Sequence, residues 1–231
     1  MIVRPAADAI HLITQPDHAA LSRRIMEHWL PLTDHPRRAS ILLAIGEHDN
    51  GWREPDDSPM LDASGCVVDF VRIPVAVRQA VWPRGVARLH ADAWAAALVA
   101  QHAITVYARY RSDAEWATFF PQMEATRDHL VGAARLSPST LLDDYSFVRL
   151  GDLLSLTFCT GWTDPQQHEG WTVVHRDNHV VVTPDGFPER EIALEVPAVE
   201  VPSKPFASEE ALRAALATSP HVTLTGVISR T

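Results

Sequence analysis

Apolar residues recur at the spacing of an α-helix over most of the first 160 residues. Turn residues and prolines interrupt this pattern and divide it into separate segments. The expected helices cover residues 15–29, 37–47, 75–89, 93–110, 113–135 and 139–158. Between residues 52 and 74 the periodicity is lost and prolines, aspartates and a glycine recur, so we expect a long loop there. A loop of that length in a compact domain is often functional, because it can shape a pocket.

The pattern changes after residue 161, where β-branched runs and turn residues replace the helical spacing. Strands are expected at 171–174, 179–183, 191–201 and 221–228, with one short helix at 208–216. The alternating stretch 10–14 is consistent with either a short strand or an extended lead-in. The expected fold class is therefore mainly α, with a helical body over residues 1–160 and a small antiparallel β appendage over residues 161–231 packed on it.

Composition limits the classes of partner. The 231-residue chain is 46% hydrophobic with a formal net charge of −9, so it lacks the basic excess that binds nucleic acid or anionic membranes. No apolar run approaches the roughly 18 residues of a membrane span, and residues 1–5 lack the apolar segment of a signal peptide. We therefore expect a cytoplasmic protein whose partner is a small-molecule substrate, and the oligomeric state stays open. Cys66 and Cys159 are too few for a disulfide framework.

Candidate chemistry begins at the adjacent pair His48 and Asp49, which ends the apolar helical segment 37–47. Asn50 and Gly51 follow, and both residue types tolerate the backbone angles found where a helix stops. An imidazole and a carboxylate side by side at that point can direct a nitrogen and an oxygen into one cavity, which suits a metal ion. The alternative is a histidine that caps the helix next to an exposed aspartate.

Three further residues place ligand chemistry on apolar helix faces. His18 stands at the start of the first helix, and His102 has apolar neighbours one turn away on either side. Asp152 lies among valine and leucine residues, where an unpaired carboxylate would cost several kcal/mol. A metal ion would offset that cost. The alternatives are a hydrogen-bonded core histidine at position 102, a cap at a helix break beside Gly151, and a surface histidine at position 18.

The order of these residues along the chain resembles that of the HD-domain superfamily, whose members are helical metalloproteins. In that superfamily a metal is held by a histidine from one helix, an adjacent His-Asp pair from the next, and an aspartate from a late helix. The resemblance implies an HD-like helical bundle with one metal held by four residues. Those residues are His18, His48, Asp49 and Asp152. His102 is then a ligand of a second metal or an acid/base that faces the substrate.

A narrower resemblance covers more of the chain. The segments TQPDHAAL at 14–21, EHDNGW at 47–52 and LLSL at 153–156 are similar to the bacterial family of proteins of unknown function DUF3891. The similarity extends over the whole chain, including the β-rich tail. No reaction is established for that family, so this resemblance implies a relationship and not an activity.

The implied function is that of a metal-dependent enzyme with a divalent ion, Mn, Mg, Zn or Fe. With a Lewis-acidic ion it would be a phosphohydrolase acting on a small-molecule phosphoester, the commonest activity of the superfamily that the chain resembles. Asp49 and His102 are then catalytic, and Trp52, Arg53 and Tyr107 line the substrate pocket. One alternative is an HD-type di-iron oxygenase acting on a small organic substrate, with Asp49 bridging the irons. The other is a non-catalytic HD-like protein that binds a ligand or partner.

Overall fold

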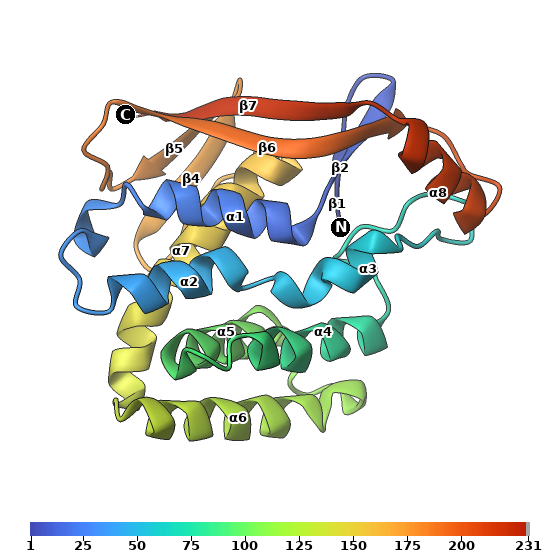
Figure 1. The fold of residues 1–231 in the computed structure, drawn as a ribbon. Helices are drawn as coiled ribbons and strands as arrows, with labels where there is room; N and C mark the ends of the chain where they lie inside the picture. The colour runs from blue at the N-terminus through green and yellow to red at the C-terminus, as the bar shows by residue number, and fades with distance from the viewer. Residues whose placement is uncertain (230–231) are drawn as a thin grey trace.

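The computed structural model describes residues 1–229 as a mixed α/β fold built on one seven-stranded sheet (Figure 1). Within this part of the chain the strand order is β1-β2-β6-β7-β5-β4-β3. Neighbouring strands are antiparallel except β5 and β7, which are parallel. The strands are β1 Ile2–Pro5, β2 Ala9–Ile13, β3 Gln166–His168, β4 Trp171–Arg176, β5 His179–Thr183, β6 Glu191–Pro202 and β7 His221–Ser229.

The prediction of a mainly α, HD-like bundle with a small β appendage is wrong, because the sheet draws strands from both ends of the chain. The N-terminal strands β1 and β2 form a hairpin, and β2 pairs with β6 in a register that joins Ile10 to Val201. Alternate residues of β6 are buried, so its inward face carries part of the common core. The stretch 10–14 is therefore a strand over most of its length. A division into two folding units at residue 160 stays a prediction.

The helices lie in successive layers on one side of the sheet (Figure 1). α1 contacts β6, and α2, α5 and α6 follow in that order with increasing distance from the sheet. α7 contacts α1, α2, α5, α6 and β4, so this one long helix ties the layers together. The helices are α1 Gln15–Met26, α2 Arg38–Glu47, α3 Arg53–Asp57, α4 Val75–Arg88, α5 Ala93–Val106, α6 Phe119–Ala134, α7 Pro138–Thr160 and α8 Glu209–Thr218.

Local sequence signals explain most helix starts. Thr14, Asp92, Ser137 and Ser208 each accept a hydrogen bond from a backbone N–H in the first turn of the following helix. The expected loop from residue 52 is only partly a loop, because its first residues, 53–57, form the short helix α3.

Among the described residues, no helix is both long and apolar enough to cross a lipid bilayer.

One glycine sets the path of the chain just after the His48-Asp49 pair. A Cβ on Gly51 would lie 1.9 Å from the Val81 carbonyl oxygen of α4, a distance that no real contact allows. The Asn50 side chain donates to the Gly85 carbonyl of the same helix at 3.3 Å. The segment that follows the pair is therefore pressed directly against the backbone of α4.

We expect Gly51→Ala to lower the free energy of unfolding by about 3 kcal/mol or more, because backbone must move to admit the methyl group. Gly132→Ala is the matched control: it lies inside α6 with no atom near its added Cβ, and alanine there favours the helix by up to about 1 kcal/mol. Urea unfolding of both variants measures the two effects. Equal stabilities of the two variants would contradict the close approach at Gly51.

Candidate metal centre

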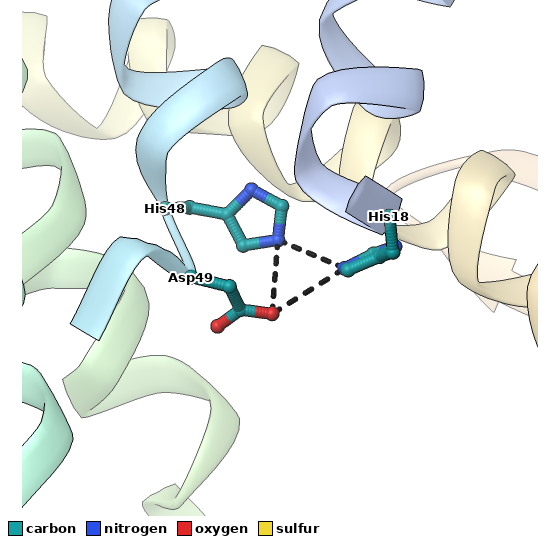
Figure 2. Close-up of side chains that lie close together, drawn as sticks. All are labelled: His18, His48 and Asp49. Carbon is teal, nitrogen blue, oxygen red and sulfur yellow. Dashed lines mark hydrogen bonds and ion pairs between the residues drawn. The ribbon is translucent and has the colours of Figure 1, made fainter. Parts of the chain in front are cut away.

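Four side chains that are distant in sequence meet at one buried point between α1, α2 and α7. The Nε2 atoms of His18 and His48 lie 3.1 Å apart. Each of these nitrogens lies 3.4 to 3.5 Å from one oxygen of Asp49 and from one oxygen of Asp152. Figure 2 shows His18, His48 and Asp49 pointing toward one another, with His18 on one helix and the pair at the end of the next. All four residues are buried.

These distances suit four ligands of a single ion. Ligand atoms about 2.1 Å from a tetrahedral ion are about 3.4 Å from each other, and neighbouring ligands of an octahedral ion are about 3.0 Å apart. The five observed distances, between 3.1 and 3.5 Å, lie within about 0.1 Å of this range. A buried group of His and Asp side chains is therefore present that could hold a metal ion.

The second ring nitrogen of each histidine fixes which nitrogen faces the centre. The Nδ1 of His48 donates to the Ile45 carbonyl oxygen at 2.7 Å. The Nδ1 of His18 lies 2.7 Å from the Ser155 hydroxyl, which can accept from the imidazole while it donates to the Asp152 carbonyl at 3.3 Å. With both Nδ1 atoms donating, the two Nε2 atoms present lone pairs to each other and to two carboxylates. A metal ion or a proton at the centre would stabilise this arrangement.

A second glycine brings α7 close enough to supply Asp152. A Cβ on Gly151 would lie 2.8 Å from a side-chain carbon of Met26 and from the Ser22 hydroxyl oxygen, both on α1, and 3.2 Å from Ile45 of α2. Because residue 151 has no side chain, α7 packs directly on α1 and α2, and the next residue reaches the centre. α7 continues through this position, so Asp152 does not cap a helix break.

The charges at the centre favour a bound cation. Burial by itself lowers the pKa of His18, but hydrogen bonds to Asp152 and Asp49 outweigh burial and hold that pKa well above its usual range. Burial by itself raises the pKa of Asp152, yet hydrogen bonds to the two histidines hold it well below its usual range. The protein thus keeps the carboxylate ionised in its interior, where an ionised group needs a positive partner.

His102 lies one step further from the centre. Its Nε2 is 3.8 Å from the second oxygen of Asp152, and its Nδ1 is 3.1 Å from the Tyr145 hydroxyl. Burial, above all, lowers the pKa of His102 to about 3, so the ring is neutral. With His48 and Asp152 it forms a second group that could hold a metal ion. Its role as ligand or as acid/base stays a prediction.

The residues expected to line a substrate pocket lie in different places. Trp52 and Tyr107 are buried in the core, and Tyr107 contacts Trp82, whose ring lies 5.6 Å from that of His102. Arg53 lies on the surface, where its half-exposed side chain pairs with Glu47 at 3.1 Å. Trp82 therefore lies between Tyr107 and His102, and Arg53 lies outside the centre.

Sequence reasoning missed three residues that α7 brings to the centre. Arg149 forms an ion pair with Asp152. The Ser155 hydroxyl contacts His18, and the Tyr145 hydroxyl contacts His102. They stand three residues before, three after and seven before Asp152, which puts all of them on one face of the helix. This spacing was the available signal, since polar side chains one turn from a buried aspartate share its environment.

We expect Ser155→Ala to weaken metal affinity about 10- to 100-fold, because the hydroxyl orients the His18 ring. Competition with a chromogenic chelator measures the affinity. Ser146→Ala is the control, because Ser146 lies on the same helix and bonds only the Asp143 carbonyl. An affinity unchanged in Ser155→Ala would show that the hydroxyl does not position a ligand.

Comparison with known proteins identifies a family but no activity. Residues 1–203 match the family described as "Protein of unknown function (DUF3891)". No curated protein and no solved structure gives a significant match to the chain. The match to the family includes every residue of the centre, from α1 to α7.

Proposed function

The chain belongs to the DUF3891 family, whose description states no reaction, and from the geometry of its buried centre we propose that it is a metal-dependent phosphohydrolase. The proposed ligands are His18, His48, Asp49 and Asp152. The substrate is a small-molecule phosphoester. The ion is Mn²⁺, Mg²⁺, Zn²⁺ or Fe²⁺, since two imidazoles and two carboxylates suit any of these.

A single observation carries the proposal of a metal: the two Nε2 atoms face each other at 3.1 Å while both Nδ1 atoms are engaged elsewhere. A proton on His18 would also supply a positive charge at the centre. A proton alone, however, does not account for two carboxylates and two oriented imidazoles that converge in the interior, where each buried charge is costly. Four protein ligands leave positions open on an ion that prefers five or six, which is typical of a catalytic ion.

Arg149 supports an anionic substrate. Its side chain pairs with Asp152 and is 27% exposed, so it extends from the centre toward solvent. A guanidinium at that point can bind a phosphate with two parallel hydrogen bonds. When bound, the metal would supply a hydroxide nucleophile at neutral pH and polarise a phosphoryl oxygen. His102, held by the Tyr145 hydroxyl, is the proposed acid/base that faces the substrate, and Asp49 and Asp152 hold the negative charge that retains the ion.

The order of the four proposed ligands along the chain adds support by analogy. It is the order His, His-Asp, Asp that resembles HD-type metalloproteins, among which phosphoester hydrolysis is common. The observed mixed α/β fold differs from the helical bundle that this resemblance implied, so the analogy concerns the ligands alone.

We expect the wild-type protein, reconstituted with Mn²⁺, Zn²⁺, Mg²⁺ or Fe²⁺ in turn, to release phosphate from at least one of a panel of generic phosphoesters. Arg149→Gln should lower kcat/KM about 100-fold while metal content is retained, because the anion loses its guanidinium partner. Arg53→Gln is the control and should leave kcat/KM unchanged, because that arginine lies on the surface. The absence of phosphate release with every ion and every phosphoester would overturn the proposal.

One observation favours the di-iron oxygenase as a second candidate. His102, with His48 and Asp152, forms the second group that could hold an ion, and the aromatic ring of Trp82 lies beside it. Such surroundings suit an uncharged organic substrate. Finding two equivalents of iron, with oxygen consumed on addition of substrate, would place this candidate ahead of the hydrolase.

A further inference from the structure

A pocket at the C-terminal end of α7 is separate from the metal centre. Gly161, on its wall, lies nine residues after Asp152, about 14 Å further along the helix axis. The pocket has a volume of about 360 Å³ and lies where the end of α7, the strand β1 and the hairpin of β4 and β5 meet. Arg4 and His175 line it from β1 and β4, two strands on opposite sides of the sheet's centre.

His175 is a buried polar side chain whose hydrogen-bonding capacity is not filled. It is 5% exposed, neither ring nitrogen makes a well-formed hydrogen bond, and the Gly161 backbone offers the ring a single weak polar contact. One of its neighbours is the Phe158 ring, whose centroid lies 6.0 Å away and offers no hydrogen-bonding atom. Buried polar groups in native proteins are nearly always hydrogen-bonded, so an imidazole with unfilled hydrogen-bonding capacity beside a pocket calls for a partner that enters the pocket.

Arg4 is a cation without a counterion. One of its terminal nitrogens donates to the Phe158 carbonyl at 2.9 Å, which leaves most of its five N–H donors available. Among residues 1–229 no carboxylate forms an ion pair with this guanidinium. Burial lowers its pKa, the direction expected for a cation that lacks a compensating charge.

The pocket is positive in a protein that is negative overall. Of the described residues that line it, Arg4 and Arg176 are cationic and Asp177 is the one carboxylate, so the lining carries a formal charge of +1. The whole chain carries −9. Burial and, next, the Arg4 guanidinium lower the pKa of His175, whereas the Gly161 carbonyl and Asp177 raise it; the net shift is downward. An anion in the pocket would offset this positive charge.

We infer that this pocket binds a small acidic molecule through a carboxylate or phosphate group. Arg4 forms the ion pair with the anion, and His175 donates a hydrogen bond to it. The volume of about 360 Å³ exceeds what a bare oxyanion fills, so the group is carried on a small organic body. Thr160, Gly161 and Thr163, at and just after the end of α7, line the wall against which that body lies.

Isothermal titration calorimetry tests this inference. The full chain is titrated with inorganic phosphate and with acetate, at constant ionic strength and with EDTA present. EDTA removes metal, so binding at the metal centre does not contribute, and failure of the proposed hydrolase leaves this result unaffected. We expect saturable binding of at least one anion, weakened tenfold or more in Arg4→Gln and in His175→Phe. Arg213→Gln, an exposed arginine of α8, should bind as the wild type does.

A second measurement covers the case in which a variant fails to fold. In the folded wild-type protein, the imidazole NMR signals of His175 should shift on addition of the anion that binds, and those of the exposed His221 should not. Preference for phosphate over acetate would identify a phosphorylated molecule, and the reverse a carboxylic acid. The absence of saturation into the millimolar range for both anions, or equal affinity in Arg4→Gln, would overturn the inference.

Discussion

Replacing His48 by alanine is expected to remove the bound metal and, with it, all metal-dependent hydrolysis. Wild-type protein purified without chelator or affinity metal should contain about one equivalent of a divalent ion. His48 supplies a nitrogen that lies within 3.5 Å of three other proposed ligand atoms, so its loss opens the centre on one side. Asp152→Asn should have the same effect, because it removes one of the two negative charges that retain the ion. Elemental analysis of the folded proteins measures the metal directly.

Two controls separate a ligand effect from a general effect of mutation. His221→Ala removes an exposed histidine of β7, and Asp143→Asn removes an exposed carboxylate from the same helix as Asp152. Both should keep the full metal content. A wild-type protein that takes up no metal, even after reconstitution with Mn²⁺, Fe²⁺ and Zn²⁺, would leave a proton on His18 as the cation of the centre and would falsify the metal-site hypothesis.

Replacing Asp144 by alanine is expected to lower the free energy of unfolding by about 3 to 5 kcal/mol. The Asp144 side chain is fully buried and accepts two hydrogen bonds from the Arg37 guanidinium, at 2.5 and 2.9 Å. It also accepts one from the Trp94 indole at 2.8 Å. The carboxylate thus joins α7 to the starts of α2 and α5. Its removal leaves a guanidinium and an indole N–H without their partner.

Asp144→Asn should cost less than the alanine variant, because the amide retains the shape and one acceptor oxygen. Asp143→Ala is the matched control: the neighbouring residue is exposed, and its loss should change stability by about 0.5 kcal/mol at most. Urea unfolding followed by circular dichroism measures all three. Equal losses at positions 143 and 144 would contradict the role assigned to the buried carboxylate.

The four proposed ligands could be selected from the sequence on two grounds: each is a polar residue within or at the end of an apolar helical segment, and their order resembles that of HD-type metalloproteins. Asp152 is the clearest instance, since valine and leucine residues surround it along the chain and burial of a lone carboxylate is costly. The structure brings these residues to one point. Arg53 shows the limit of the same reasoning: its closeness to the His-Asp pair in sequence did not bring it to the centre, because α3 turns its side chain toward Glu47.

The sequence by itself determined most of the helices and the C-terminal strands, because helical periodicity, capping residues and β-branched runs act within a few positions of each other. Only the tertiary structure decided the fold class. The strand β2 pairs with β6, whose residues lie almost the whole length of the chain away, and its own five residues alternate too weakly to reveal that pairing. Strand pairing depends on which distant segment completes the buried face.

Tertiary structure also decided how the centre is arranged. The Nε2 atoms face inward because the Ile45 carbonyl and the Ser155 hydroxyl engage the other nitrogens. Asp152 reaches them because Gly151 admits close packing of α7 on α1 and α2. Apart from the Ile45–His48 bond at the end of α2, these are contacts between elements. The local sequence therefore determined which polar residues stand in apolar helical segments. The packing of the helices on a sheet that takes strands from both ends of the chain decided which of these residues meet.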